Sequence, residues 1–61
     1  MKYKITFEFR NERGDWVPDY LDDCGGGFYE ADALDITRQL KYYGRRNVQL
    51  VEMPEIDDME G

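Results

Sequence analysis

The first ten residues alternate between polar and apolar side chains. Within residues 2–10 the apolar positions fall on one face, and they are Tyr3, Ile5, Phe7 and Phe9. A period of two with aromatic and β-branched residues predicts a half-buried strand. The segment NERGD at 11–15 is typical of a turn. Residues 16–21 (WVPDYL) predict a second, antiparallel strand, which Pro18 restricts to an edge or a bulge.

The apolar period becomes helical after the glycines at 25–27. Between Tyr29 and Tyr43 the apolar residues recur at spacings of three and four, and they are Tyr29, Ala33, Ile36, Leu40 and Tyr43. This stripe predicts an amphipathic helix, and Gly44 is a natural C-terminal stop. If Tyr29 is the capping residue, Phe28 and Ala33 are placed for a hydrophobic staple.

Residues 47–53 predict a third strand. Which of its faces is buried is ambiguous, because apolar residues occur at both even and odd positions. We expect Val48 and Leu50 in the core, with Val51 and Met53 on the other face. A helical crossover normally sets the strand it reaches parallel to the strand it left.

The order β-β-α-β therefore predicts one small α+β domain over residues 1–53. It has a three-stranded antiparallel sheet of order 2-1-3 and one helix on one face. The other face carries Lys2, Lys4, Thr6 and Glu8, and it is either solvated or a docking surface. We expect residues 54–61, which are rich in acids, to be a C-terminal tail.

Size and charge limit the classes of function. A chain of 61 residues builds a marginal core, so we expect a partner subunit or a host protein to support it. The net charge of −6 repels phosphate, which disfavours direct nucleic-acid binding and binding to anionic membranes. It favours a partner with a basic surface. We expect neither a signal peptide nor a transmembrane segment, and an unpaired cysteine fits the cytosol.

The stretch DDCGGGFYEAD at 22–32 combines the lone cysteine, three glycines and several acids. The chain has no histidine to activate Cys24, and its neighbours Asp22 and Asp23 are acids, whereas a reactive thiolate needs a nearby base or positive field. The glycines lack the residues that complete a phosphate-binding loop. We interpret them as a hinge into the helix. Neither the glycines nor the acids match a metal, cofactor or catalytic motif, so we expect no enzyme.

Two surface features are candidates for partner binding. Leu34 is expected to point outward from the helix, and Tyr42 lies on its flank, where tyrosine is a favoured interface anchor. The second feature is a spaced row of acids that could occupy a groove built for a nucleic-acid backbone. Its members are Asp19, Asp22, Asp23, Glu55, Asp57 and Asp58.

The chain resembles the very small acidic accessory proteins encoded by phages and prophages of Gram-positive bacteria. The resemblance covers residues 1–53, in the segments MKYKITFEFR, WVPDYLDD, GGGFYEADALDITRQL and RRNVQLVEM. Several such proteins inhibit host defence stoichiometrically, including anti-CRISPR proteins. They share no common functional motif, so the resemblance assigns no role to any residue.

The resemblance implies a non-enzymatic inhibitor in the host cytosol that blocks a basic nucleic-acid-binding surface of an effector nuclease. Two alternatives remain open. In the first, the chain is a self-associating module, a homodimer formed through the open sheet face or an edge strand. In the second, it binds nucleic acid through the basic residues near the helix end, which are Arg38, Lys41, Arg45 and Arg46.

Overall fold

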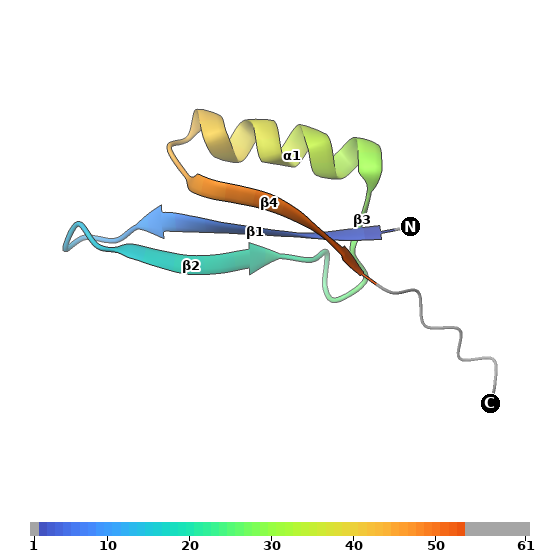
Figure 1. Cartoon of the computed structure of the whole chain (residues 1–61), viewed down its shortest axis with the longest axis horizontal. Coiled ribbons are helices and arrows are strands. Elements are labelled where there is room, and N and C mark those ends of the chain that lie inside the picture. Colours follow the sequence, from blue (N-terminus) through green and yellow to red (C-terminus); the bar gives the residue numbers. More distant parts are fainter. Residues whose placement is uncertain (1, 54–61) are drawn as a thin grey trace.

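The computed structural model describes residues 2–53 and shows one sheet covered by one helix. The elements follow one another as β1 (Lys2–Arg10), β2 (Trp16–Leu21), β3 (Phe28–Tyr29), α1 (Glu30–Tyr42) and β4 (Arg46–Met53). All strand pairs are antiparallel, and α1 lies across one face of the sheet (Figure 1). The expected α+β architecture is confirmed. The tail at 54–61 lies outside the described residues.

Strand β1 is the centre of the sheet. Strand β2 pairs with residues 5–10 along one edge, and β4 pairs with residues 2–8 along the other. The predicted order, with the last long strand beside the first, is confirmed. Strand β3 pairs with Lys2 and Tyr3 on the edge that β2 leaves free. We did not predict β3, because two residues are too few to show an alternation.

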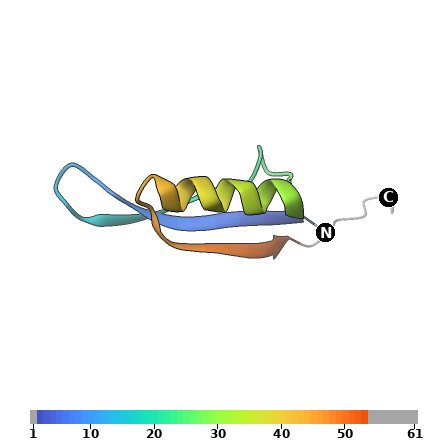
Figure 2. The ribbon, with the colours of Figure 1, turned by 90° about the horizontal axis from the view of Figure 1, so that it is seen from above.

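The core lies between β1, β4 and the helix. Its fully buried members are Ile5, Phe7 and Ala33, and its partly buried members are Tyr3, Phe9, Phe28, Ile36, Leu40, Val48 and Leu50. The predicted facing of the last strand, with Val48 and Leu50 inward, is confirmed. The helix packs on β1, β3 and β4 but not on β2. The β1–β2 hairpin consequently extends beyond the helix (Figure 2).

Tyr29 and Tyr43 flank α1 as its two cap residues. Both were expected in the buried stripe, and this expectation is wrong because both side chains are exposed. A cap residue has already left the helical backbone, so the helical period does not set its direction. Tyr29 instead belongs to β3, opposite Lys2. Within residues 2–53, no helix is long and apolar enough to cross a bilayer.

The helix ends just before Gly44, as its sequence indicates. The Gly44 N–H donates to the Lys41 carbonyl at 3.1 Å, and the Arg45 N–H donates to the Leu40 carbonyl at 3.0 Å. These two bonds form a Schellman motif, in which the residue after the cap needs a left-handed backbone. Gly44 supplies it with φ +88°.

The glycine run forms a tight turn between β2 and β3. The Asp22 carbonyl accepts a hydrogen bond from the Gly27 N–H at 2.7 Å, and the Asp23 carbonyl accepts one from the Gly26 N–H at 3.2 Å. Gly27 has φ +82°, and a Cβ at this position would lie 2.8 Å from the Lys2 Cβ. Its lack of a side chain lets the turn approach the start of β1 closely.

A β-bulge interrupts β4 near its start. The register with β1 shifts between Thr6 and Glu8, and Asn47 at this point has φ +55°. Because the bulge inserts one residue, Arg46 faces the same side of the sheet as Gln49. A regular strand would turn Arg46 toward the helix side.

Candidate functional site

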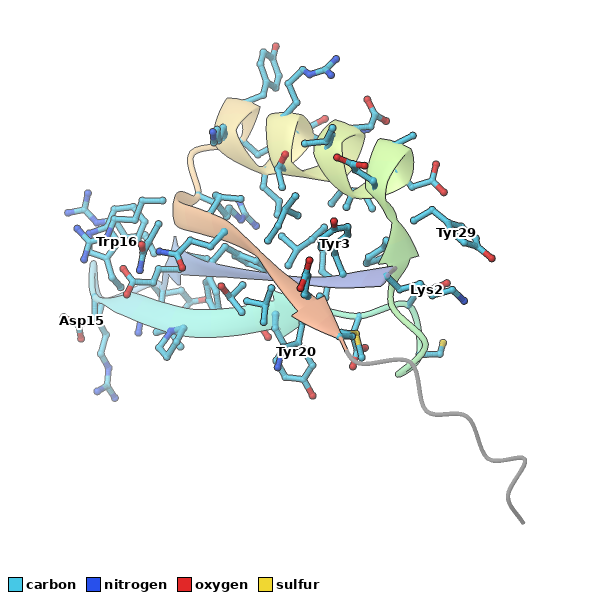
Figure 3. The ribbon with its side chains drawn as sticks, turned by 45° about the vertical axis from the view of Figure 1, so that its right-hand side comes forward. Lys2, Tyr3, Asp15, Trp16, Tyr20 and Tyr29 are labelled. Carbon is cyan, nitrogen blue, oxygen red and sulfur yellow. The ribbon has the colours of Figure 1, made fainter. Side chains whose placement is uncertain are left out.

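The sheet face opposite α1 is uncovered within residues 2–53. It carries the even-numbered side chains of β1 and β2, with the residues that β3 and β4 place opposite them. We call part of it the cation–aromatic face, which consists of Lys2, Lys4, Arg10, Trp16, Tyr20, Tyr29 and Arg46. In Figure 3, Trp16 lies at one end of the molecule, and Lys2 and Tyr29 lie at the other.

At one end of this face, two guanidinium groups lie against the indole of Trp16. The Arg46 Cζ is 4.2 Å from the ring centre, and the Arg10 Cζ is 5.8 Å from it. Arg46 also donates from Nε to the Glu8 carboxylate at 2.7 Å. Its side chain thus connects the two outer strands, β4 and β2, across the central strand.

At the other end, two lysines lie over two tyrosine rings. The Lys2 Nζ is 4.9 Å from the centre of the Tyr29 ring, and the Lys4 Nζ is 5.4 Å from the Tyr20 ring. Despite these contacts, Tyr20 is 55% exposed and Tyr29 is 63% exposed. The lysine stems are flexible, so most of each ring is available to a ligand.

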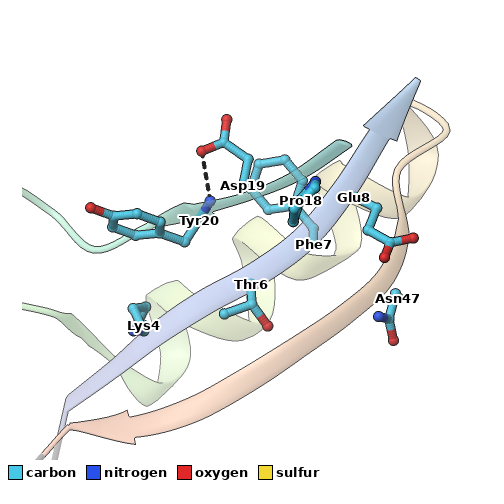
Figure 4. A pocket seen from close by; sticks show the side chains of 8 residues that line it. All are labelled: Lys4, Thr6, Phe7, Glu8, Pro18, Asp19, Tyr20 and Asn47. Carbon is cyan, nitrogen blue, oxygen red and sulfur yellow. Dashed lines mark hydrogen bonds between the residues drawn. The ribbon is translucent and has the colours of Figure 1, made fainter. Parts of the chain in front are cut away.

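A shallow hollow of about 270 Å³ lies in the middle of the open face (Figure 4). Lys4, Thr6, Phe7 and Glu8 line it from β1, Pro18, Asp19 and Tyr20 from β2, and Asn47 from β4. Small-molecule sites typically have volumes of roughly 300–1,000 Å³ and enclose their ligand. This open hollow instead suits a group that projects from a larger ligand.

Charge is segregated on the molecule. The four cations of the face are half of the eight bases in the chain. The only acid placed opposite or among them by the described registers is Glu8, which Arg46 neutralises. Of the fourteen acids, Glu55, Asp57, Asp58 and Glu60 follow Met53. Residues 2–53 therefore have ten acids against eight bases, a net charge of −2, and yet one face is positive.

Three of the six predicted acids lie within the described residues, on β2 and in the turn that follows it. Asp19 lies on β2, where its Oδ1 accepts a hydrogen bond from the Tyr20 N–H at 2.8 Å. Asp22 and Asp23 follow in the turn, where Asp22 is half-buried and Asp23 is exposed. Glu55, Asp57 and Asp58 lie outside the described residues.

The helix presents a second exposed surface. Leu34 is 46% exposed, as expected, and Tyr42 is 83% exposed. The ring of Tyr42 meets that of Tyr43 edge to face, with centres 5.2 Å apart. The two tyrosines line an open hollow of about 260 Å³ with Asp35, Arg38 and Gln39. Because Tyr42 and Tyr43 end the helix, the hollow lies toward the end of α1 that is remote from the turn at 22–27 (Figure 1).

The turn itself offers little reactive chemistry. Cys24 is a free, exposed thiol with φ +61°. No group of three or more Cys, Asp and Glu side chains within residues 2–53 could hold a metal ion. The features that define this turn are its positive φ values and its backbone hydrogen bonds.

Our sequence analysis missed the cation–aromatic face. The alternation in the first strand placed Lys2 and Lys4 on the open face. The sequence did not assign Trp16 and Tyr20 of the second strand to that same face. Arg46 was grouped with the helix-end bases, because only the bulge turns it toward the sheet face. Comparisons with family models, curated proteins and solved structures found no match to this chain.

Proposed function

We propose that the chain is a non-enzymatic protein-binding inhibitor of phage or mobile-element origin, acting in the host cytosol. The observation that supports this is the display of Tyr42, which is 83% exposed on an ordered helix. An aromatic side chain on a rigid element buries a large area with little loss of entropy, so it is a favoured interface anchor. An anti-CRISPR protein is the specific form that the sequence resemblance suggests.

The helix surface has the spacing of a helix that docks into a groove. Leu34, Arg38 and Tyr42 are four residues apart in turn, so they follow one side of α1. The hollow beside Tyr42 and Tyr43 can receive a side chain of the partner. We therefore assign the protein contact to this helix surface and treat the acids as a separate electrostatic contribution.

The partner's chemistry follows from the remaining charge. Asp22 and Asp23 belong to the turn before β3, which lies near the start of α1 (Figure 1), whereas Tyr42 is the last residue of that helix. A partner that contacts both ends must be large, and the acids favour a basic surface such as a nucleic-acid channel. Charge contributes mainly to the rate of association and to its salt dependence, while the buried anchor sets the residence time.

The test is inhibition of purified RNA-guided effector nucleases by the wild-type chain and two matched double variants. L34A/Y42A removes the helix anchors, and D22N/D23N removes two acids without changing size. We expect the first pair to weaken inhibition by at least about 30-fold, the effect of losing an anchor worth about 2 kcal/mol. Loss of inhibition with D22N/D23N alone would assign binding to the acids. Absence of inhibition by the wild-type chain across the nucleases would contradict the proposal.

A second candidate function is self-association through β4. Within residues 2–53, no strand pairs with the outer edge of this eight-residue strand. An unpaired edge is a template for a second copy. Sedimentation at micromolar concentration tests this candidate: a dimer supports it, and a strict monomer excludes it.

A further inference from the structure

We propose that the cation–aromatic face binds single-stranded nucleic acid. This goes beyond the inhibitor function, because it uses the opposite side of the molecule from the helix surface. It also revises the expectation, based on net charge, that nucleic acid is not a direct partner. The net charge of −6 describes the whole chain, whereas the face presents four cations and one neutralised acid, with one further acid, Asp19, beside its central hollow.

The face supplies both kinds of contact that a single strand requires. Unpaired bases stack on aromatic rings, and their phosphates pair with nearby lysines and arginines. Here a lysine Nζ lies over each ring, at 4.9 Å for Tyr29 and 5.4 Å for Tyr20. A base that displaces the lysine from either ring would keep its own phosphate within reach of that flexible side chain.

The geometry of the face is held by contacts within the sheet. Lys2 and Tyr29 are opposite one another on paired strands, as are Arg10 and Trp16. Arg46 is fixed by its bond to Glu8 and by its contact with the indole. At the Trp16 end, such a preorganised surface loses less side-chain entropy when a ligand binds.

The length of the face fits a short single strand. Lys2 and Arg10 are the two ends of β1, and eight steps of about 3.3 Å give roughly 26 Å between them. The site sizes of compact single-strand-binding domains begin at about four nucleotides. The central hollow of about 270 Å³ lies along this path.

The same observations disfavour duplex DNA and acidic peptides. A duplex hides its base faces, so it cannot use Tyr20 or Tyr29. The helix, the element that could enter a major groove, has Glu30 and Asp32 in its first turn. An acidic peptide would use the cations but would leave the exposed rings without a role.

The experiment measures fluorescence anisotropy of labelled twelve-residue oligo(dT) and oligo(U), with a twelve-base-pair duplex for comparison. We expect binding to both single strands at 50 mM salt and at least tenfold weaker binding to the duplex. Raising the salt to 200 mM should weaken binding by roughly 20-fold if three phosphates are contacted. No binding at 50 mM salt would overturn the proposal.

Three double variants assign the binding to the face. K2Q/K4Q should weaken binding and flatten its salt dependence, and Y20L/Y29L should weaken it by at least about fivefold for each base that is stacked. L34A/Y42A on the helix surface should leave it unchanged. All are exposed or half-exposed sites, and a thermal melt checks that each variant is folded.

Two outcomes would overturn the proposal even if binding is observed. If the lysine variant abolishes binding and the tyrosine variant does not change it, the face is an electrostatic surface for any polyanion, including an acidic peptide. If L34A/Y42A abolishes nucleic-acid binding, the helix surface is the site. Inhibition of the nuclease is scored separately, so failure of either proposal leaves the other standing.

Discussion

The Arg46 guanidinium lies 4.2 Å from the centre of the Trp16 ring while its Nε donates to Glu8 at 2.7 Å. One side chain thereby joins three strands on the open face of the sheet. The joining depends on the bulge at Asn47, which turns Arg46 away from the helix side. The feature that organises the face is therefore a backbone irregularity.

Replacement of Arg46 by Gln should destabilise the domain and change the surroundings of the indole. The exposed cation–π contact contributes about 0.5–1 kcal/mol and the ion pair about 0.2–1 kcal/mol. A loss of about 1 kcal/mol lowers the Tm of so small a domain by roughly 4–8 °C. Trp16 is the only tryptophan, so its fluorescence reports the contact directly. R45Q is the matched control, because within residues 2–53 the Arg45 side chain donates only to the Tyr43 carbonyl. If R46Q leaves the fluorescence spectrum as unchanged as R45Q does, the contact with the indole is contradicted.

Substitutions at Asn47 should show that the backbone conformation of the bulge, and not strand propensity, sets the stability at this position. Val is a better strand former than Gly, so a regular strand would be stabilised by N47V. At φ +55° the order reverses, because a β-branched residue is strained there and glycine is not. We expect N47V to cost about 1–2 kcal/mol and N47G to be nearly neutral in urea unfolding. Equal stabilities of the two variants would contradict the left-handed conformation.

The two glycines at 25 and 27 should respond differently to alanine. Both have a positive φ, of +90° and +82°, so both substitutions strain the backbone by a similar amount. Only at Gly27 would the new Cβ also meet the Lys2 Cβ, at 2.8 Å. We expect G27A to be destabilising by at least about 1 kcal/mol more than G25A, as overpacking typically costs about 1–3 kcal/mol. Urea unfolding of both variants measures the difference, and equal midpoints would mean that the turn does not pack against β1.

The elements with a strong period were predicted correctly, and the face that combines them was not. The alternation in β1 and the stripe through Ala33, Ile36 and Leu40 are visible within one segment, and the crossover rule then sets the strand order. The contact between Lys4 and Tyr20 needs the register of two strands. The contact between Arg46 and Trp16 needs, in addition, a bulge that depends on the backbone of Asn47.

The charge of the C-terminal segment provides a test that distinguishes the two proposed ligands. Glu55, Asp57 and Asp58 follow β4, whose last residue, Met53, pairs with Lys2 at one end of the cation–aromatic face. The variant E55Q/D57N/D58N removes three negative charges from the full chain. For a single strand, we expect tighter binding at 50 mM salt and a smaller change at 200 mM, because long-range repulsion is screened there.

For a basic protein partner, the same variant should have the opposite effect. Removal of attractive charge slows association and weakens inhibition of the nuclease at low salt. The control is E30Q/D32N/D35N, which also removes three acids, all of them from α1. If both variants change nucleic-acid binding equally, only net charge matters and the segment has no special position. If the tail variant strengthens oligonucleotide binding and weakens inhibition, the acids serve the protein contact while they oppose the nucleic-acid contact.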